Sequence, residues 1–420
     1  MGMKQLGFWS LLSISIGSQI GSGIFLLPSS LACFGWYGIY GTILAGLAAV
    51  LLSFMFARLC ILGAQSGGPH VYIAKVFGHN AAFFVGWSYW LLSWISSCVL
   101  VMSGIEYLAP LLPCGHKFSL LFELVALFVI TYINTRDIKI SASLEIVLSA
   151  MKFLPLIIFP LYAMDFFNVE NICASSYSEQ NISSSLLQSL LISFWGFIGL
   201  ECAIAPSDSV YNASVTIPRA MLIGTMLVAA VYVLNNVVMM GCVPASVLMN
   251  QATSYLVFAE KVFGHCGQIV MGVLGFVFCI GTLNAWTFIT GQIALSLTAD
   301  GYLPEWFSRK NSYGAPYIVL YSVCICMSLL LIMTHVYDET DRIKEMIELS
   351  VSGFVLIYCL CACAYYRMST YRIEKYVALC GIAICIMILS SMTWMHMLML
   401  VCMIGSGAIV YAFTKQYRGG

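Results

Sequence analysis

Two ionisable side chains, Lys152 and Glu201, lie inside apolar stretches and are the first candidates for chemistry. A charge deep in hydrocarbon costs at least ~2.5 to 3.5 kcal/mol on insertion scales, so each is expected to have a partner or a function. Glu201 could carry a proton, or it could couple the binding of a ligand to the movement of a gate. The alternative is a neutral acid that is hydrogen-bonded to free backbone. For Lys152 the alternative is snorkelling to the membrane surface, which its mid-span position makes unfavourable.

Two glycine-rich segments interrupt runs that otherwise have the composition of membrane helices. They are residues 17–23 (GSQIGSG) and residues 195–201 (WGFIGLE). Such a segment is expected either to break its helix or to form a face of small residues against a neighbouring helix. Matching positions in the first and sixth apolar runs favour the break.

A broken helix leaves backbone N–H groups unpaired at the start of its second half, where the helix dipole is positive. Ser22, Gly23 and Ile24 would supply these donors to a carboxylate. Carbonyl groups freed on the opposite side, around Ser18 and Gly196, could accept an ammonium group. The pattern therefore predicts a zwitterionic ligand rather than a sugar or an inorganic ion.

Aromatic side chains near the interruptions could complete such a site. Trp195 and Trp286 are placed to stack on an apolar or cationic ligand side chain. Tyr89, Trp90 and Trp94 either line an outer vestibule or face lipid, since aromatic residues are also common at membrane interfaces.

These groups must be positioned by a membrane protein. The chain is 61% hydrophobic and 9% charged, which excludes a soluble globular protein of 420 residues. Its formal charge of +0 shows none of the excess of basic residues that is typical of nucleic-acid-binding proteins. It has no P-loop and no His-Glu-x-x-His motif, so neither ATP-driven pumping nor metalloprotease chemistry is supported, and no cofactor or metal is expected.

We predict an all-α polytopic protein with about twelve membrane-spanning helices, because uninterrupted apolar runs of about 20 residues are typical of spanning helices. The predicted spans are Gly7 to Leu27, Ile39 to Leu62, Ala81 to Leu108, Phe118 to Ile133, Leu144 to Ala163, Leu186 to Pro206, Ala220 to Val243, Gln268 to Leu297, Tyr317 to Thr334, Met346 to Tyr366, Tyr376 to Thr393 and Met395 to Thr414.

Basic residues in the connections predict the orientation. If the N-terminus is cytoplasmic, thirteen basic residues fall on the inner side. Four fall on the outer side, namely Lys117, Lys261, Arg342 and Lys344. The excess places both termini inside the cell.

The two interrupted spans are five spans apart. With an odd number of spans in each repeat the second copy is inserted upside down, which is typical of an inverted-repeat transporter with its site at the midplane. We expect a transport core over residues 1–366, with repeats at about 7–165 and 185–366. Residues 367–420 would add two further helices.

Five motifs in this order resemble the amino acid–polyamine–organocation superfamily, and the likeness extends over essentially the whole chain. They are GSGIFLLP from Gly21, GGPHVY from Gly67 with Phe77-Gly78, FWGFIGLE from Phe194, Pro218-Arg219-Ala220, and DGYLP from Asp300. The chain is most similar to the basic amino acid/polyamine antiporter branch, which includes the arginine/agmatine exchanger. The resemblance implies a LeuT-type core of five plus five helices with helices 1 and 6 broken, two peripheral helices, and alternating access.

The resemblance also implies roles for individual residues. Ser22 and Gly23 would bind the substrate carboxylate, Trp195 and Trp286 would contact the substrate side chain, and Glu201 would be the pH-responsive carboxylate. Tyr89 matches an outer-gate tyrosine, and Ser350 or Ser352 matches a polar contact in the tenth span.

Two residues depart from the arginine exchanger. Ser97 replaces an asparagine that contacts the guanidinium group. Lys152 occupies a position that is apolar there but resembles the lysine of proton-coupled carriers, where it would substitute for a sodium ion.

We therefore expect a secondary amino acid transporter in a bacterial inner membrane. It would exchange a cationic amino acid for its decarboxylated amine or for another amino acid. A proton-coupled symporter is the alternative, and a non-transporting sensor of the same fold is the alternative from another class. The expected partners are an amino acid or polyamine, a proton and the lipid bilayer, with a homodimer left open. Neither enzymatic activity nor a nucleic-acid partner is expected.

Overall fold

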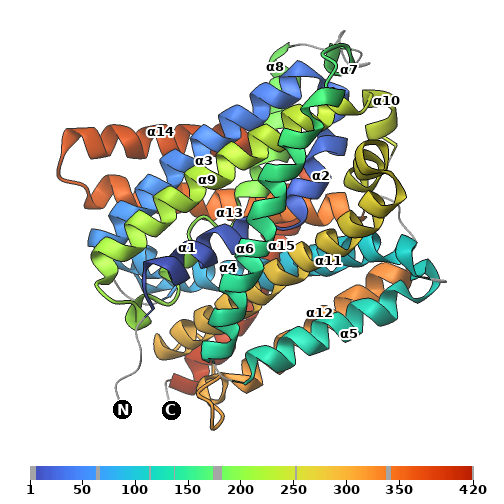
Figure 1. Cartoon of the computed structure of the whole chain (residues 1–420). Helices are drawn as coiled ribbons and strands as arrows, with labels where there is room; N and C mark the ends of the chain where they lie inside the picture. The colour runs from blue at the N-terminus through green and yellow to red at the C-terminus, as the bar shows by residue number, and fades with distance from the viewer. Residues whose placement is uncertain are drawn as a thin grey trace.

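The structure is a computed structural model. It describes residues 6–62, 67–112, 115–136, 138–173, 182–250, 253–336 and 342–418. Long helices, several of them tilted across one another, make up most of this described part (Figure 1). The start of α1 and the end of α15 lie at the same end of the bundle in Figure 1, as an even number of spans requires.

The described residues of the first half of the chain form eight α-helices. They are α1 (Phe8–Gln19), α2 (Ser22–Leu31), α3 (Trp36–Leu62), α4 (His70–Leu108), α5 (Ser119–Asn134), α6 (Ile138–Tyr162), the short α7 (Glu170–Cys173) and α8 (Ile182–Phe194). The 3-10 turns η5 (Trp195–Phe197) and η6 (Cys202–Ile204) continue the sixth span after α8.

The second half continues with helices only, among the residues that the structure describes. They are α9 (Ala213–Cys242), the short α10 (Ala245–Leu248), α11 (Ser254–Ala299), α12 (Tyr317–Val336), α13 (Arg342–Met368), α14 (Arg372–Leu389) and α15 (Trp394–Arg418).

Ten helical segments in the described part of the chain are long and apolar enough to cross a membrane. The shorter apolar helix α5 and the helix α14, which carries three charges in its first turn, occupy the two other predicted spans. Exposed apolar side chains cover the outer helices, among them Leu47, Phe128, Leu329 and Val401. Such a surface is stable only in lipid, so the chain is an integral, multi-pass membrane protein.

Two helices begin well before the start that the apolar runs predict. α4 starts at His70 and α11 at Ser254, and each changes direction at a glycine, Gly78 (φ 84°) or Gly264 (φ 68°). A backbone with positive φ is open mainly to glycine, so the chain can turn there without ending the hydrogen-bonded helix. The predicted loops before the third and eighth spans are therefore partly helical.

Helix packing relates the two halves of the core. The first span, α1, packs against α9 of the seventh, and the sixth span, α8, packs against α3 of the second. α3 also packs against α9, α4 against α11, and α5 against α12. Helices in equivalent positions of the two predicted repeats thus pack against each other, and the contact of α1 with α9 is matched by that of α8 with α3. This is the pattern expected of an inverted repeat, and the bounds of the repeats stay a prediction.

The last two helices pack on the outside of the core. α14 contacts α13 and α3, and α15 contacts α4 and α13. Trp87 Nε1 donates to Ser406 Oγ at 3.1 Å, and Tyr411 OH donates to Asn80 Oδ1 at 2.7 Å. The division at residue 366 falls near the end of α13 and stays a prediction.

Candidate functional site

The first interrupted span is broken in the structure. α1 ends at Gln19, Ile20 (φ −82°, ψ 93°) and Gly21 (φ −137°, ψ −132°) leave helical geometry, and α2 begins at Ser22. The first N–H groups of α2 consequently have no acceptor within their own helix. This is the location expected for carboxylate recognition.

The sixth span is broken at the matching place. α8 ends at Phe194, the turn η5 follows, and the backbone is extended at Ile198 (φ −63°, ψ 132°). Gly199 then adopts a φ of 102°. A side chain at Gly199 would be strained, and its Cβ would lie 3.1 Å from the Ser18 main-chain oxygen, so glycine allows this break to contact the other.

The two breaks touch each other directly. A Cβ on Gly23 would lie 2.9 Å from the Cα of Gly196 and 3.1 Å from the hydroxyl of Tyr232. Trp195 Nε1 donates to Ser22 Oγ at 3.3 Å. Residues far apart in sequence thus form one continuous backbone-lined site.

Lys152 contacts the first break. Its side chain is 0% exposed, and Nζ donates to the main-chain oxygen of Gly17 at 3.1 Å and to Thr282 Oγ1 at 2.7 Å. Thr282 Oγ1 in turn lies 2.6 Å from the oxygen of Ile20. The amine therefore joins α6 and α11 to the broken first span, and it does not extend to the membrane surface.

Two further carbonyl groups of the first break also have donors. Trp286 Nε1 donates to the Ser18 oxygen at 3.2 Å, and Tyr232 OH donates to the Gln19 oxygen at 3.0 Å. Of the carbonyls around Ser18 and Gly196 that were expected to bind an ammonium group, those of Ser18 and Gln19 therefore already accept a protein hydrogen bond.

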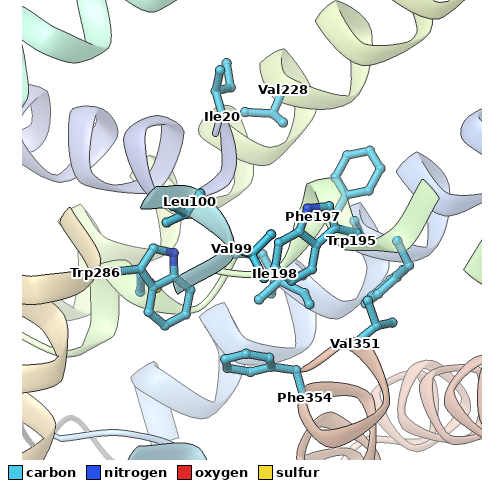
Figure 2. Packing of buried hydrophobic residues seen from close by; sticks show 14 of the residues in the cluster. Ile20, Val99, Leu100, Trp195, Phe197, Ile198, Val228, Trp286, Val351 and Phe354 are labelled. Carbon is cyan, nitrogen blue, oxygen red and sulfur yellow. The ribbon is translucent and has the colours of Figure 1, made fainter. Parts of the chain in front are cut away.

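A small cavity of about 20 Å³ lies between the breaks, enough for about one water molecule. The residues that line it are Ser18, Gln19, Gly21, Ser22, Gly23, Ser96, Leu100, Trp195, Ile198, Thr282 and Trp286. Figure 2 shows Trp286 and Trp195 on either side of Leu100 and Ile198 in that view, with Phe354 of α13 nearby. This cavity would have to expand to hold an amino acid.

Glu201 lies beyond the sixth-span break with a donor on each carboxyl oxygen. Tyr89 OH donates to Oε1 at 2.7 Å, and Tyr358 OH donates to Oε2 at 2.5 Å. The glutamate is 2% exposed. The partners on these oxygens are side chains of α4 and α13, so a movement of the sixth span relative to those helices would change the environment of the carboxyl group.

Tyr89 lies against Glu201 and outside the lining of the central cavity, and its match to an outer-gate tyrosine stays a prediction. With Glu201 it lines a second, smaller cavity beside Gly67, Gly68 and Pro69. The basic residues assign the connection that contains these residues to the cytoplasmic side. In that predicted orientation Tyr89 would lie toward the cytoplasmic side of the central cavity.

A family model described as "Amino acid permease" matches residues 6–390. The chain belongs to the amino acid permease family. Among curated relatives, this permease is 24% identical over 395 residues to the cadaverine/lysine antiporter of Escherichia coli (strain K12), covering 91% of this chain and 88% of the relative.

Two other relatives of the permease are transporters of similar substrates. The arginine/ornithine antiporter of Pseudomonas aeruginosa is 26% identical over 445 residues, covering 99% of this chain and 92% of the relative. The putrescine transporter PotE of Haemophilus influenzae is 25% identical over 364 residues, covering 85% and 83%.

Some predicted site residues of the permease lie together and others do not. Ser18, Ser22, Gly23, Trp195 and Trp286 line the central cavity. Ile24 and Gly196 are buried in the two breaks beside it.

Two predicted serines face elsewhere. Ser97 Oγ donates to the Ser93 main-chain oxygen at 2.7 Å, and Ser350 Oγ donates to the Met346 oxygen at 2.7 Å. Neither of them lines the cavity of the permease, whereas Ser96 does. Adjacent helical residues point about 100° apart, so Ser96 and Ser97 face different directions, and a role for Ser97 in substrate binding stays a prediction.

Several residues that contact the site were not predicted from the sequence. Gln19 and Thr282 line the cavity, and Tyr358 holds Glu201. Gln19 lies inside the segment at residues 17–23, so it could have been found as a polar residue beside a break, and Thr282 lies four residues, about one helical turn, before Trp286. Tyr358 had no local signal, because it is one of 23 tyrosines.

Gly23→Ala is expected to reduce transport about tenfold or more. The added Cβ would lie 2.9 Å from the Cα of Gly196, a main-chain atom that can move only if the breaks separate. Overpacking of this kind costs about 1–3 kcal/mol. Uptake into vesicles, normalised to the amount of folded permease, measures the effect.

Gly381→Ala is the matched control. Its Cβ would lie 3.5 Å from the nearest atom, on Leu52, which is ordinary van der Waals contact. We expect near-normal transport from this variant. Normal transport by Gly23→Ala would show that the breaks need not touch.

Proposed function

We propose that the permease exchanges a cationic amino acid for its decarboxylated amine, or for another amino acid, by alternating access. The observation that carries this proposal is the meeting of two broken spans at one cavity, where N–H groups at the start of α2 face the side chains of Trp195 and Trp286. The names of the relatives supply the substrate class, since they include antiporters of lysine, arginine, ornithine and cadaverine.

Each part of an amino acid has a proposed partner. The N–H groups of Ser22, Gly23 and Ile24 bind the carboxylate at the positive end of α2. The aromatic faces of Trp195 and Trp286 contact the side chain. None of the residues described as lining the cavity is acidic, so a cationic side chain would be held by aromatic faces and hydroxyl groups.

Glu201, Tyr89 and Tyr358 form the proposed inner gate. Phe354 connects this proposed gate to the central cavity, because its ring centroid lies 5.6 Å from that of Tyr89 and 5.5 Å from that of Trp286. Ligand contact at Trp286 would thereby be transmitted to the gate. Protonation of Glu201 would alter its two tyrosine hydrogen bonds and release the inner side.

Proton-coupled symport is the second candidate, favoured by Lys152. Its amine lies between the first break and α11 and donates to oxygens of Gly17 and Thr282. A sodium ion that linked these two segments would have to bind in the same place. Net uptake with a proton would then need no sodium.

Reconstituted vesicles separate these modes. Labelled lysine, arginine or ornithine is offered to vesicles that are empty or loaded with unlabelled amino acid or amine. We expect uptake that requires internal substrate. Uptake into empty vesicles driven by an inward proton gradient would favour symport, and binding without uptake in either assay would favour the sensor.

The charge pattern of the connections and the bacterial relatives support a cellular location and an orientation. We propose a bacterial inner membrane with both termini in the cytoplasm. The protein could act as a homodimer, and crosslinking in native membranes would measure this. Accessibility of a single labelled cysteine at the C-terminus, from outside and after permeabilisation, tests the orientation.

A further inference from the structure

Arg136 lies just beyond the end of α5 and is exposed. Its guanidinium carbon is 4.6 Å from the ring centroid of Tyr132 and 5.7 Å from that of Tyr313. The guanidinium group also donates to both tyrosine hydroxyls, at 3.3 Å in the case of Tyr313. Tyr132 belongs to α5 and Tyr313 to the connection before α12. Aromatic rings from two segments therefore hold this cation in place.

Arg136 also ends a stripe of exposed apolar side chains on α5. Val125, Phe128, Val129 and Tyr132 are between 42% and 55% exposed and have the spacing of one helical face. Arg136 follows Tyr132 by four residues, about one further turn. The neighbouring helix α12, which lies beside α5 at the lower right of Figure 1, likewise exposes Ile325, Leu329 and Met333. In a membrane, lipid chains cover these faces.

A second basic segment is attached to the same end of α5. Asn311 Nδ2 donates to the main-chain oxygen of Thr135, the residue before Arg136. Asn311 Oδ1 accepts from two main-chain N–H groups of its own turn. These bonds fix the turn that follows Arg309 and Lys310 against the end of α5. Both of these basic residues are exposed.

The charge at this end of α5 is positive. Within the part of the chain that the structure describes, none of Arg136, Arg309 and Lys310 forms an ion pair. Asp137 and Glu305 are the acidic residues near them in sequence, so basic residues are in excess. A guanidinium group has more N–H donors than the two tyrosine hydroxyls accept, and its planar fork matches the oxygens of a phosphate group.

We propose that Arg136, together with Arg309 and Lys310, binds the phosphate group of an anionic phospholipid whose acyl chains lie along α5 and α12. A phospholipid carries phosphate and apolar chains in one molecule, and this end of the helix pair presents a fixed cation directly beyond an apolar face. In the proposed orientation the lipid belongs to the cytoplasmic leaflet, where basic residues attract anionic headgroups. The site lies outside the substrate cavity and goes beyond the proposed function.

The test is the thermal stability of the purified permease in detergent micelles. The micelles are supplemented with dioleoyl phosphatidylglycerol or with dioleoyl phosphatidylcholine, which have the same acyl chains. Titration of each lipid gives an apparent Kd, because a ligand that binds the folded state raises its stability. The wild type should prefer phosphatidylglycerol. Arg136→Gln should reduce that preference about fivefold, the effect expected of one basic residue beside an anionic headgroup.

Arg372→Gln is the matched control, because it removes the same charge from an exposed position at the start of α14. It should keep the wild-type preference. An equal loss in Arg372→Gln would show that only net charge matters, and equal Kd values of the two lipids in the wild type would show that no headgroup is selected. Either result overturns the proposal, as does an unchanged preference in Arg136→Gln.

If Arg136→Gln does not fold, the double variant Arg309→Gln/Lys310→Gln decides, since both side chains are exposed. It should also reduce the preference, and an unchanged preference would refute the site. Inorganic phosphate is added to lipid-free micelles in a final series. It should not stabilise the wild type, and stabilisation equal to that by phosphatidylglycerol would assign the site to a soluble anion and overturn the lipid.

Discussion

Lys152→Met is expected to reduce sodium-free transport about tenfold or more while the helix bundle stays folded. The substitution keeps the length of the side chain but removes the nitrogen that joins Gly17 to Thr282. A hydrogen bond that involves a charged group is typically worth about 1.5–3 kcal/mol. The substitution should mainly destabilise the conformation in which the first break and α11 are held together.

Lys152→Ala should behave differently, because it leaves space as well as removing the amine. If the amine substitutes for a sodium ion, sodium should partly restore transport in this variant, and choline should not. Parallel uptake assays in sodium and choline media, with a thermal melt of each variant, measure this. Normal transport by Lys152→Met in choline would refute the role of the amine.

Glu201→Gln is expected to remove the pH dependence of transport and to lower its rate about tenfold, since neutral hydrogen bonds replace charge-assisted ones. The amide keeps an oxygen that can accept from one tyrosine, so the local structure should persist. A change that involved only packing would lower the rate equally at every pH. Exchange rates measured across a pH series separate the two effects.

Tyr358→Phe is the companion variant. It removes the 2.5 Å contact to Oε2 and leaves the titratable group and the Tyr89 contact in place. We expect its pH profile to shift rather than flatten. A Glu201→Gln permease with the wild-type profile would exclude the carboxyl group as the proton-sensitive element.

The sequence was sufficient for the membrane fold and for the two breaks. Apolar runs of about 20 residues must be helical in lipid, since no water is present to satisfy the backbone. The segments at residues 17–23 and 195–201 are rich in glycine, which weakens a helix locally whatever surrounds it. Both signals depend on neighbours in the chain, and both features are present in the structure.

The burial of Lys152 and Glu201 was also predictable, because each lies in an apolar run. Their partners were not. Glu201 meets Tyr358 across 157 positions of sequence, and Lys152 meets Thr282 across 130. Such contacts depend on how each helix is rotated and tilted in the bundle. The residue composition of a helix does not determine that rotation or tilt.

The same physical reason explains the details of the cavity. Whether Ser96 or Ser97 faces it depends on a rotation of about 100° in α4. The contact of Tyr89 with Glu201 likewise depends on how α4 packs against the sixth span. By itself, the sequence determined where helices must break and which charges must be buried. Only tertiary packing decided which atoms face one another across the breaks, because those contacts are made between helices.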